Sequence, residues 1–249
     1  MAGSESEEVK ILGGWPAWPS PFVMRARVAL NIKSVNYEFL EQPYGTKSEL
    51  LLKSNPVYKK VPVLIHGDKS ICESMNIVQY IDDVWSSSGH SIMPSDPYDA
   101  SIARFWATYI DDKFFPSLMG IAKSKDAEEY TAAIEQMIAA FGLLEQAYQE
   151  ISKGKDFFGG EKIGYIDIAF GCYIGSIKVT EKMNGIKLFD ETKAPGLTKW
   201  ADKFCADETV KPVDFITRRF NAGNRKPKLS WSFLRRLLDL NLPFKLKKL

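Results

Sequence analysis

The sequence contains few of the side chains that act as a paired nucleophile and base or that hold a metal ion. Its 249 residues include two histidines, His66 and His90, and three cysteines, Cys72, Cys172 and Cys205. They are scattered along the chain, and no CxxC or HExxH motif is present. This distribution argues against a histidine-based catalytic triad and against a zinc site, so we expect no metal ion. Three isolated cysteines also make no disulfide framework, which favours a reducing cytoplasmic setting.

The chain also lacks the glycine-rich motifs that bind nucleotide phosphates, because neither GxGxxG nor GxxxxGK[ST] occurs. No apolar run reaches the ~18 uncharged residues expected of a membrane-spanning helix. The N-terminal segment is acidic and has no apolar stretch, unlike a secretory signal or an arginine-rich transit peptide. These absences favour a cytoplasmic globular protein.

Charge is nearly balanced over the whole chain but unevenly placed. There are 33 Lys and Arg residues against 31 Asp and Glu residues, a formal net charge of +2. Residues 218–249 hold ten basic residues and a single acid, so the preceding chain is mildly acidic. A weakly amphipathic stretch from Trp231 to Leu240 allows one interpretation of this tail as a membrane-surface or polyanion binder. We favour a solvated tail and expect neither a membrane nor a nucleic acid as partner.

Periodicity divides the chain into two domains joined by a linker. Residues 9–86 alternate short strands and helices, which predicts an α/β domain. Residues 87–98 are polar and punctuated by Gly and Pro, as in a linker. Residues 99–217 follow helical spacing, which predicts an all-helical domain ahead of the basic tail at 218–249.

Individual elements follow from the same patterns. We expect strands at residues 9–14, 37–40, 61–65 and 70–72, with His66 in a hairpin turn. Helices are expected at 22–32, 48–52, 74–85, 98–115, 127–151, 165–183, 196–205 and 210–216. In the first of these helices, Arg25 and Arg27 interrupt the apolar positions, which suggests an amphipathic helix. The helix from 165 is preceded by Gly164 and has Asp167 in its first turn, which predicts a structural capping box.

Three segments of the first domain carry the residues of chemical interest. Trp18-Pro19-Ser20-Pro21-Phe22 puts a serine directly before a helix, where serine commonly caps the first turn. Val61-Pro62 begins a strand, and Glu73-Ser74 begins the last helix of the domain. Each segment alone has an ordinary structural explanation. Their combined order along one chain is far more specific.

That order resembles the thioredoxin-like domain of glutathione transferases, and the finer pattern resembles the plant tau class. The likeness covers roughly residues 9–213 and includes the second-domain run Gly164-Tyr165-Ile166-Asp167-Ile168. Further matching motifs are Lys47-Ser48-Glu49-Leu50-Leu51-Leu52, Asn55-Pro56-Val57-Tyr58-Lys59-Lys60-Val61-Pro62-Val63-Leu64, Cys72-Glu73-Ser74 and Pro94-Ser95-Asp96-Pro97-Tyr98. The resemblance implies an α/β thioredoxin-like N-terminal domain, an all-α C-terminal domain and a homodimer. It also implies glutathione as co-substrate, with no cofactor.

The resemblance implies five glutathione-binding residues, which are Lys47, Lys60, Val61, Glu73 and Ser74. The two lysines suit the glycyl carboxylate, and the valine backbone, next to a proline that is cis in the family, suits the cysteinyl peptide group. The glutamate suits the γ-glutamyl ammonium. The serine, at a helix N-terminus, suits the γ-glutamyl carboxylate.

The catalytic residue implied by the resemblance is Ser20, whose hydroxyl would donate a hydrogen bond to the glutathione thiolate. Such donation and the positive end of the following helix both favour the anion. A serine in this position, where related classes have cysteine, indicates conjugation of glutathione to hydrophobic electrophiles, with peroxidase activity as a side reaction. The hydrophobic acceptor site is expected to include Phe22, Tyr109, Phe115 and Met119.

The alternative function is a non-catalytic, ligandin-like carrier of hydrophobic small molecules. Two departures from the family pattern bear on it: the segment between the first strand and Ser20 is longer than usual, and the chain leaves the pattern near residue 214. The complete set of glutathione-binding residues favours the enzyme.

Overall fold

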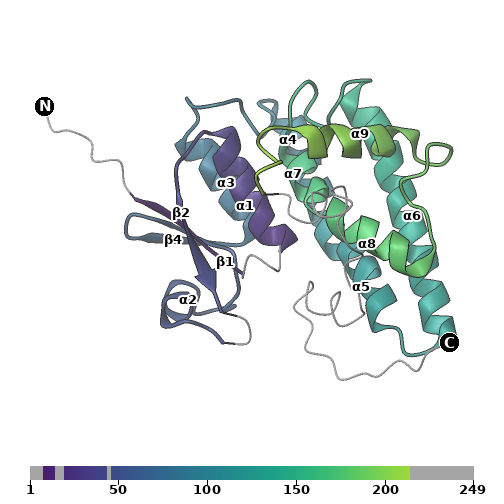
Figure 1. The fold of residues 1–249 in the computed structure, drawn as a ribbon. Coiled ribbons are helices and arrows are strands. Elements are labelled where there is room, and N and C mark those ends of the chain that lie inside the picture. The colour runs from purple at the N-terminus through teal and green to yellow at the C-terminus, as the bar shows by residue number, and fades with distance from the viewer. Residues whose placement is uncertain (1–7, 15–19, 44–45, 214–249) are drawn as a thin grey trace, which may run out of the picture.

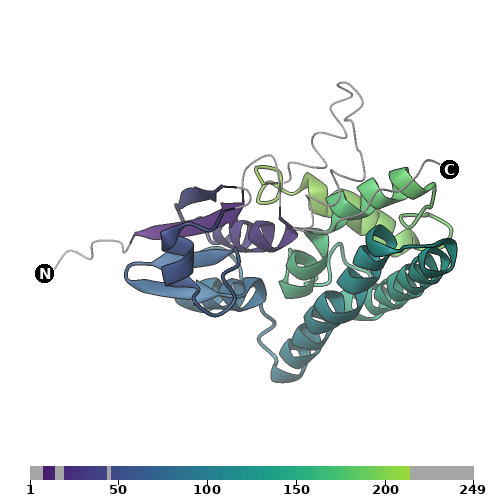
Figure 2. The same cartoon turned by 90° about the horizontal axis from the view of Figure 1, so that it is seen from below.

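A computed structural model describes residues 8–14, 20–43 and 46–213 (Figure 1). The loop before Ser20 and the basic tail therefore lie outside the described residues. Two domains lie side by side, a small sheet domain and a larger helical domain (Figures 1 and 2). Within the described ranges, no helix is both long and apolar enough to cross a membrane.

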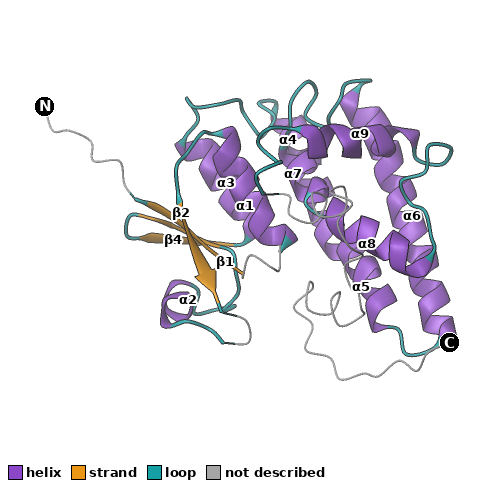
Figure 3. Cartoon of the chain, viewed as in Figure 1, coloured by secondary structure: helices purple, strands orange, loops and turns teal. Residues whose placement is uncertain are grey.

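The first domain is a four-stranded mixed sheet with helices on both faces (Figure 3). Its elements are β1 (Val9–Gly14), α1 (Pro21–Ile32), β2 (Glu38–Gln42), α2 (Glu49–Ser54), β3 (Val63–His66), β4 (Lys69–Cys72) and α3 (Ser74–Val84). The strand order is β2-β1-β3-β4, in which β1 runs parallel to β2 and β3 runs antiparallel to both of its neighbours.

Successive side chains of β1 are buried on opposite faces of this sheet. Ile11 is fully buried in the large core that includes residues of α1 and α3. Its neighbour Leu12 packs with Leu51 of α2 and Val63 of β3 in a smaller core on the other face. The period of two in a strand therefore explains why this sheet carries helices on both sides.

The second domain, as far as the structure describes it, consists of helices joined by loops and turns. The helices are α4 (Pro97–Tyr109), the π-helical turn η1 (Ile110–Phe114), α5 (Phe115–Lys123), α6 (Ala127–Ser152), α7 (Tyr165–Gly171), α8 (Ile174–Asn184) and α9 (Pro195–Ala206). Helix α1 is in contact with α7, so the helix that Ser20 caps lies against the second domain (Figure 2).

A buried ion pair fixes the linker to the first domain. Lys33, the residue that caps the end of α1, is buried and places Nζ 2.7 Å from Asp82 Oδ1. Asp82 also accepts hydrogen bonds from the backbone N–H groups of Ile92 and Met93. The linker is thus held against α1 and α3, and this attachment fixes the position from which the chain enters the second domain.

Several sequence-based boundaries need correction. The strand expected at 61–65 begins at Val63 and includes His66, because the ladder with β1 starts only after Pro62. The helix expected at 98–115 continues past Pro116 through a π turn. The expected helix 165–183 is two helices, broken at Cys172 and Tyr173. The described part of the expected helix 210–216, which ends at Val213, consists of turns.

Candidate functional site

Ser20 is the N-cap of α1, and the hydrogen bond that it makes there leaves its proton available. Its backbone is extended, and its Oγ accepts a hydrogen bond from the N–H of Val23 at 3.5 Å. Pro21 follows as the first helical residue. Its lack of an N–H costs no hydrogen bond there, because an N–H at this position has no acceptor within the helix. Because Val23 is the donor, the hydroxyl hydrogen of Ser20 remains free to be donated to a ligand.

The Val61-Pro62 peptide bond is cis, as the family resemblance implied. Val61 is half-buried and precedes β3. No backbone hydrogen bond joins it to any other residue among those that the structure describes. Its N–H and C=O groups can therefore pair with an extended peptide ligand.

Lys47 and Lys60 lie on either side of α2. Lys47 precedes Ser48, the N-cap of α2, whose hydroxyl donates to Gln42 at 2.5 Å. The carbonyl of Lys60 accepts a hydrogen bond from the buried side chain of Asn55 at 3.0 Å. Both lysines are exposed, and within the described ranges neither has an ion-pair partner. Each can therefore offer its charge to an anionic ligand.

Glu73 and Ser74 form the start of α3. Glu73 has φ 68° and ψ 119°, a conformation that non-glycine residues adopt at a cost of about 1–3 kcal/mol and that is often found at functional sites. Its carboxylate is exposed. Ser74 is buried, and its Oγ accepts a hydrogen bond from Arg25 Nη1 at 3.1 Å. The positive end of α3 thus carries a fixed hydroxyl beside an exposed carboxylate.

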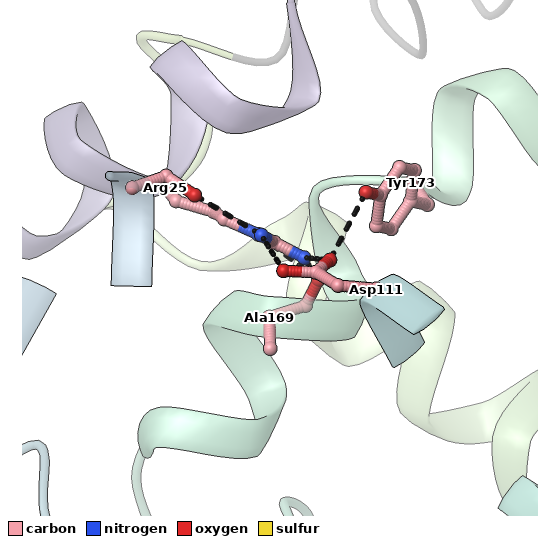
Figure 4. A network of polar contacts seen from close by, with 5 residues as sticks. Arg25, Asp111, Ala169 and Tyr173 are labelled. Atoms are coloured by element: carbon pink, nitrogen blue, oxygen red, sulfur yellow. Dashed lines mark hydrogen bonds and ion pairs between the residues drawn. The ribbon is translucent and has the colours of Figure 1, made fainter. Parts of the chain in front are cut away.

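Arg25 connects Ser74 to the helical domain, and sequence reasoning did not predict this role. The expected amphipathic helix would expose Arg25, but the side chain is completely buried. Its guanidinium binds the Asp111 carboxylate through both oxygens at 2.9 and 2.6 Å. Nε and Nη2 also donate to the carbonyl of Ala169, at 3.2 and 2.8 Å (Figure 4). One side chain therefore joins α1, α3, η1 and α7.

Tyr173 completes this network from the start of α8. Its hydroxyl donates to Asp111 Oδ1 at 3.3 Å, opposite the guanidinium (Figure 4). Burial raises the pKa of Tyr173, so the phenol stays protonated and acts as a donor. Burial also works against the charge of Arg25, but the hydrogen bonds and the negative charge of Asp111 outweigh it and raise the pKa of this side chain. The buried cation is therefore permanent and compensated.

Two of the four expected acceptor residues lie together in an aromatic cluster. Phe22 meets Phe115 edge-on with ring centroids 5.4 Å apart, and Phe115 stacks on Tyr173 at 5.3 Å. The Arg25 guanidinium lies 5.2 Å from the ring centroids of both Phe22 and Tyr173. This cluster therefore adjoins the network that holds Ser74.

The other two expected acceptor residues are placed differently. Tyr109 is half-buried and contacts Trp106 edge-on at 5.3 Å. Met119 is almost completely buried in α5. No cluster of three or more His, Cys, Asp or Glu side chains able to hold a metal ion occurs in the part of the chain that the structure describes.

Comparisons with known proteins agree with this arrangement. Residues 12–83 match the family described as glutathione S-transferase, N-terminal domain, and residues 100–208 match glutathione S-transferase, C-terminal domain. The chain therefore belongs to the glutathione S-transferase family, whose members are enzymes of the EC 2.5.1.18 type. The expected fold, a thioredoxin-like domain followed by an all-helical domain, is confirmed.

Within that family the protein is of the tau class. It is 57% identical over 208 residues to glutathione S-transferase U17 of Arabidopsis thaliana, covering 84% of this chain and 90% of that protein. The structure of a tau class glutathione S-transferase from mango, Mangifera indica, is similar with a TM-score of 0.81 and 59% identity, over 86% of this chain and 96% of that chain. A rice glutathione transferase in complex with glutathione has a TM-score of 0.74 and 30% identity, over 89% of this chain and 100% of that chain.

Proposed function

We propose that this transferase binds glutathione, stabilises its thiolate through the Ser20 hydroxyl, and transfers it to hydrophobic electrophiles. The observation that supports this most directly is the geometry of Ser20. Its oxygen accepts a hydrogen bond from the helix that it caps, so its proton is available for donation to a ligand. Ser20 also lies at the N-terminus of α1, where the partial positive charge of the helix dipole favours an anion nearby.

Stabilisation of the thiolate is what this reaction requires. A free thiol has a pKa of roughly 8.5, so only a few per cent is ionised at neutral pH. Lowering that pKa by about 2 units corresponds to roughly 2.7 kcal/mol of preferential stabilisation of the anion. The thiolate then attacks an electrophilic carbon, and a leaving group departs or the addition product takes up a proton.

The remaining glutathione contacts follow from charge and exposure. Lys47 and Lys60 are exposed cations for the glycyl carboxylate, and Val61 has backbone groups available for the cysteinyl unit. Glu73 is an exposed carboxylate for the γ-glutamyl ammonium, and Ser74 offers a hydroxyl and an N-terminal N–H for its carboxylate. The rice relative crystallised in complex with glutathione supports this choice of ligand.

The electrophile would bind beside Phe22 and Phe115, which are already in contact, with Tyr109 and Met119 as further lining residues.

A side activity is glutathione-dependent reduction of organic hydroperoxides. In it, two glutathione molecules are oxidised to the disulfide while the hydroperoxide becomes an alcohol and water. We place the protein in the cytoplasm as a homodimer, with detoxification and the stress response as its setting.

Substitution of Ser20 tests the proposal. We expect S20A to reduce kcat/KM with glutathione and a chloronitrobenzene on the order of 10²-fold, as for the loss of one preorganised donor. The pH profile of kcat/KM for the chloronitrobenzene should shift to higher pH. The reason is that the thiolate of bound glutathione loses its stabilising hydrogen bond, which raises the pKa of the thiol. Ultraviolet absorbance of the bound thiolate measures the same shift directly.

S20T is the matched control, because threonine keeps both the cap and the hydroxyl. It should retain most of the activity and the original pH profile. Equal turnover by S20A and the unaltered protein would show that Ser20 is not the catalytic group. Glutathione binding without turnover by the unaltered protein would favour the carrier function instead.

A further inference from the structure

Helix α6 presents an exposed face that carries apolar side chains together with carboxylates. Ile138 and Leu143 are 51% and 48% exposed. Glu128 and Glu135 are both exposed and lie seven residues apart, which places them on one side of the helix. At about 100° of rotation per residue, Ile138 and Leu143 flank the line of these two glutamates. A partner for this face should therefore be both apolar and positively charged.

The negative charge of α6 is not balanced within the helix. No lysine, arginine or histidine occurs from Ala127 to Ser152, whereas this segment holds five glutamates. Glu145 is buried and accepts hydrogen bonds from backbone N–H groups at the start of α9. The other four are exposed, and among the residues that the structure describes none of them makes an ion pair. The face therefore keeps its negative charge.

Two other surfaces with exposed apolar side chains differ from this face in charge. Tyr58 directly precedes Lys59, and Phe105 directly follows Arg104. All four of these side chains are exposed. A basic segment would be repelled at both places, whereas α6 would attract it.

We propose that the exposed face of α6 binds the basic tail of the same chain, residues 218–249. This tail holds ten basic residues and one acid. The occupant is identified from its sequence, because residues 214–249 lie outside the described residues. The spacing of Leu234, Leu237 and Leu238 suits one apolar side of a helix, with Arg235 and Arg236 on the other. Such a segment matches a face that combines apolar side chains with carboxylates.

The chain is long enough to reach this face. Val213, the last described residue, follows α9, which packs against α6. Residues 214–230 can extend over about 55 Å, whereas the 26 residues of α6 are ~39 Å long. The sequence alone favoured a solvated tail, because it could not show that α6 leaves an acidic and apolar face without a partner.

Hydrogen-exchange mass spectrometry of the full chain tests the proposal. We expect the amides of residues 231–240 to exchange at least about tenfold more slowly than in an isolated peptide of the same sequence. The double variant I138E/L143E should remove this protection, because it places charge where the apolar side chains of the tail would pack. E128K/E135K should also reduce it, because lysines repel the arginines of the tail.

An exchange of charges tests the pairing itself. R235E/R236E alone should lose the protection, and its combination with E128K/E135K should restore it, because opposite charges then face each other again. V84E and D99K are the matched controls. Val84 is similarly exposed, at 43%, and Asp99 is an exposed acid, but both lie on other helices. Both controls should leave the protection unchanged.

Three results would overturn the proposal. The first is exchange of residues 231–240 at the rate of the isolated peptide, and the second is equal protection in the α6 variants and the controls. The third is protection that rises with protein concentration, which would assign the contact to the tail of a second copy. None of these results depends on the transfer reaction, so the proposal stands or fails separately from the proposed function.

Discussion

Asp167 is a buried carboxylate that accepts four hydrogen bonds from three different segments. The donors are the backbone N–H groups of Phe158, Gly159 and Gly164 and the indole of Trp200, at 2.7–2.9 Å. The capping box with Gly164 was predicted from the sequence and is confirmed. The structure adds that the same side chain also ties α7 to the preceding loop and to α9.

The stability of the fold should therefore depend on the ionisation of Asp167. Burial raises the pKa of Asp167 to about 6, against 3.8 for an ordinary aspartate. The folded state binds the Asp167 proton more tightly than the unfolded state does. The stability that this protonation contributes is therefore fully present below pH 3.8 and is lost as the pH rises through about 6. Between these two pH values the free energy of unfolding should fall by about 3 kcal/mol.

Urea unfolding of the unaltered protein and of D167N across this pH range measures the effect. D167N does not titrate, so the unaltered protein should lose stability relative to it by about 3 kcal/mol as the pH rises from ~4 to ~7. Parallel curves for the two proteins would contradict the raised pKa.

The contrast between Asp167 and Arg25 shows what residue patterns can reveal. Asp167 and Gly164 are three residues apart, so a local motif identifies their contact. The partners of Arg25 lie 49, 86 and 144 residues away in the sequence. An arginine within a helix usually faces solvent, and only the fold reveals that this one is buried with a carboxylate. No local spacing links it to Asp111 or to Ser74.

At the scale of elements, the linker shows how one backbone position can fix a domain boundary. Gly89 has φ +63°, and a Cβ there would lie 2.0 Å from the carbonyl oxygen of Ile32 at the end of α1. Both the left-handed backbone and the close approach require glycine. The adjoining Ser88 hydroxyl donates to the carbonyl of Lys33 at 2.6 Å, so the linker follows the end of α1 closely.

G89A should lower the free energy of unfolding by at least about 2 kcal/mol, because the obstacle is backbone and cannot turn aside. G142A is the matched control. Gly142 lies inside α6, and nothing lies within 4 Å of a Cβ built there. That variant should gain roughly 0.5–1 kcal/mol from helix propensity. Equal melting temperatures for the two variants would refute this account of the linker.

Element types were predicted well and their interruptions poorly. The strands and helices of the first domain have clear periods and short lengths, which local patterns identify. The π turn at 110–114 and the break at Cys172 and Tyr173 lie within continuous helical periodicity. Both interruptions belong to the network around Arg25, so tertiary contacts explain what the local pattern does not.

On the scale of the whole molecule, the arrangement of the two domains places the proposed chemistry at their junction. Helix α1 begins directly after Ser20, contacts α7 and places Arg25 against the second domain. The family resemblance predicted both domain types. It did not identify the residues that join them, because these residues carry no motif of their own. The junction is thus the part of the site that depends most on the three-dimensional structure.

Exposed apolar side chains on both domains support the proposed homodimer. Val57 and Tyr58 are 78% and 58% exposed in the turn between α2 and β3, and Phe105 on α4 is 59% exposed. Buried Asn55 anchors this turn by accepting from the N–H of Tyr58 at 3.0 Å and donating to the carbonyl of Lys60. A two-fold dimer that packs this turn against α4 of a second copy would bury these residues in both copies, because the same contact then occurs two times.

F105E should therefore weaken the dimer about 100-fold or more, since burying a phenylalanine side chain contributes roughly 1.5–3 kcal/mol and the contact occurs twice. Sedimentation equilibrium measures this change. I138E is the control, because Ile138 on α6 is similarly exposed, at 51%, but lies outside the proposed interface. Equal dimerisation by the two variants would contradict the interface. Because Lys60 lies two residues after Tyr58 in the same anchored turn, dissociation should also raise KM for glutathione more than KM for the electrophile.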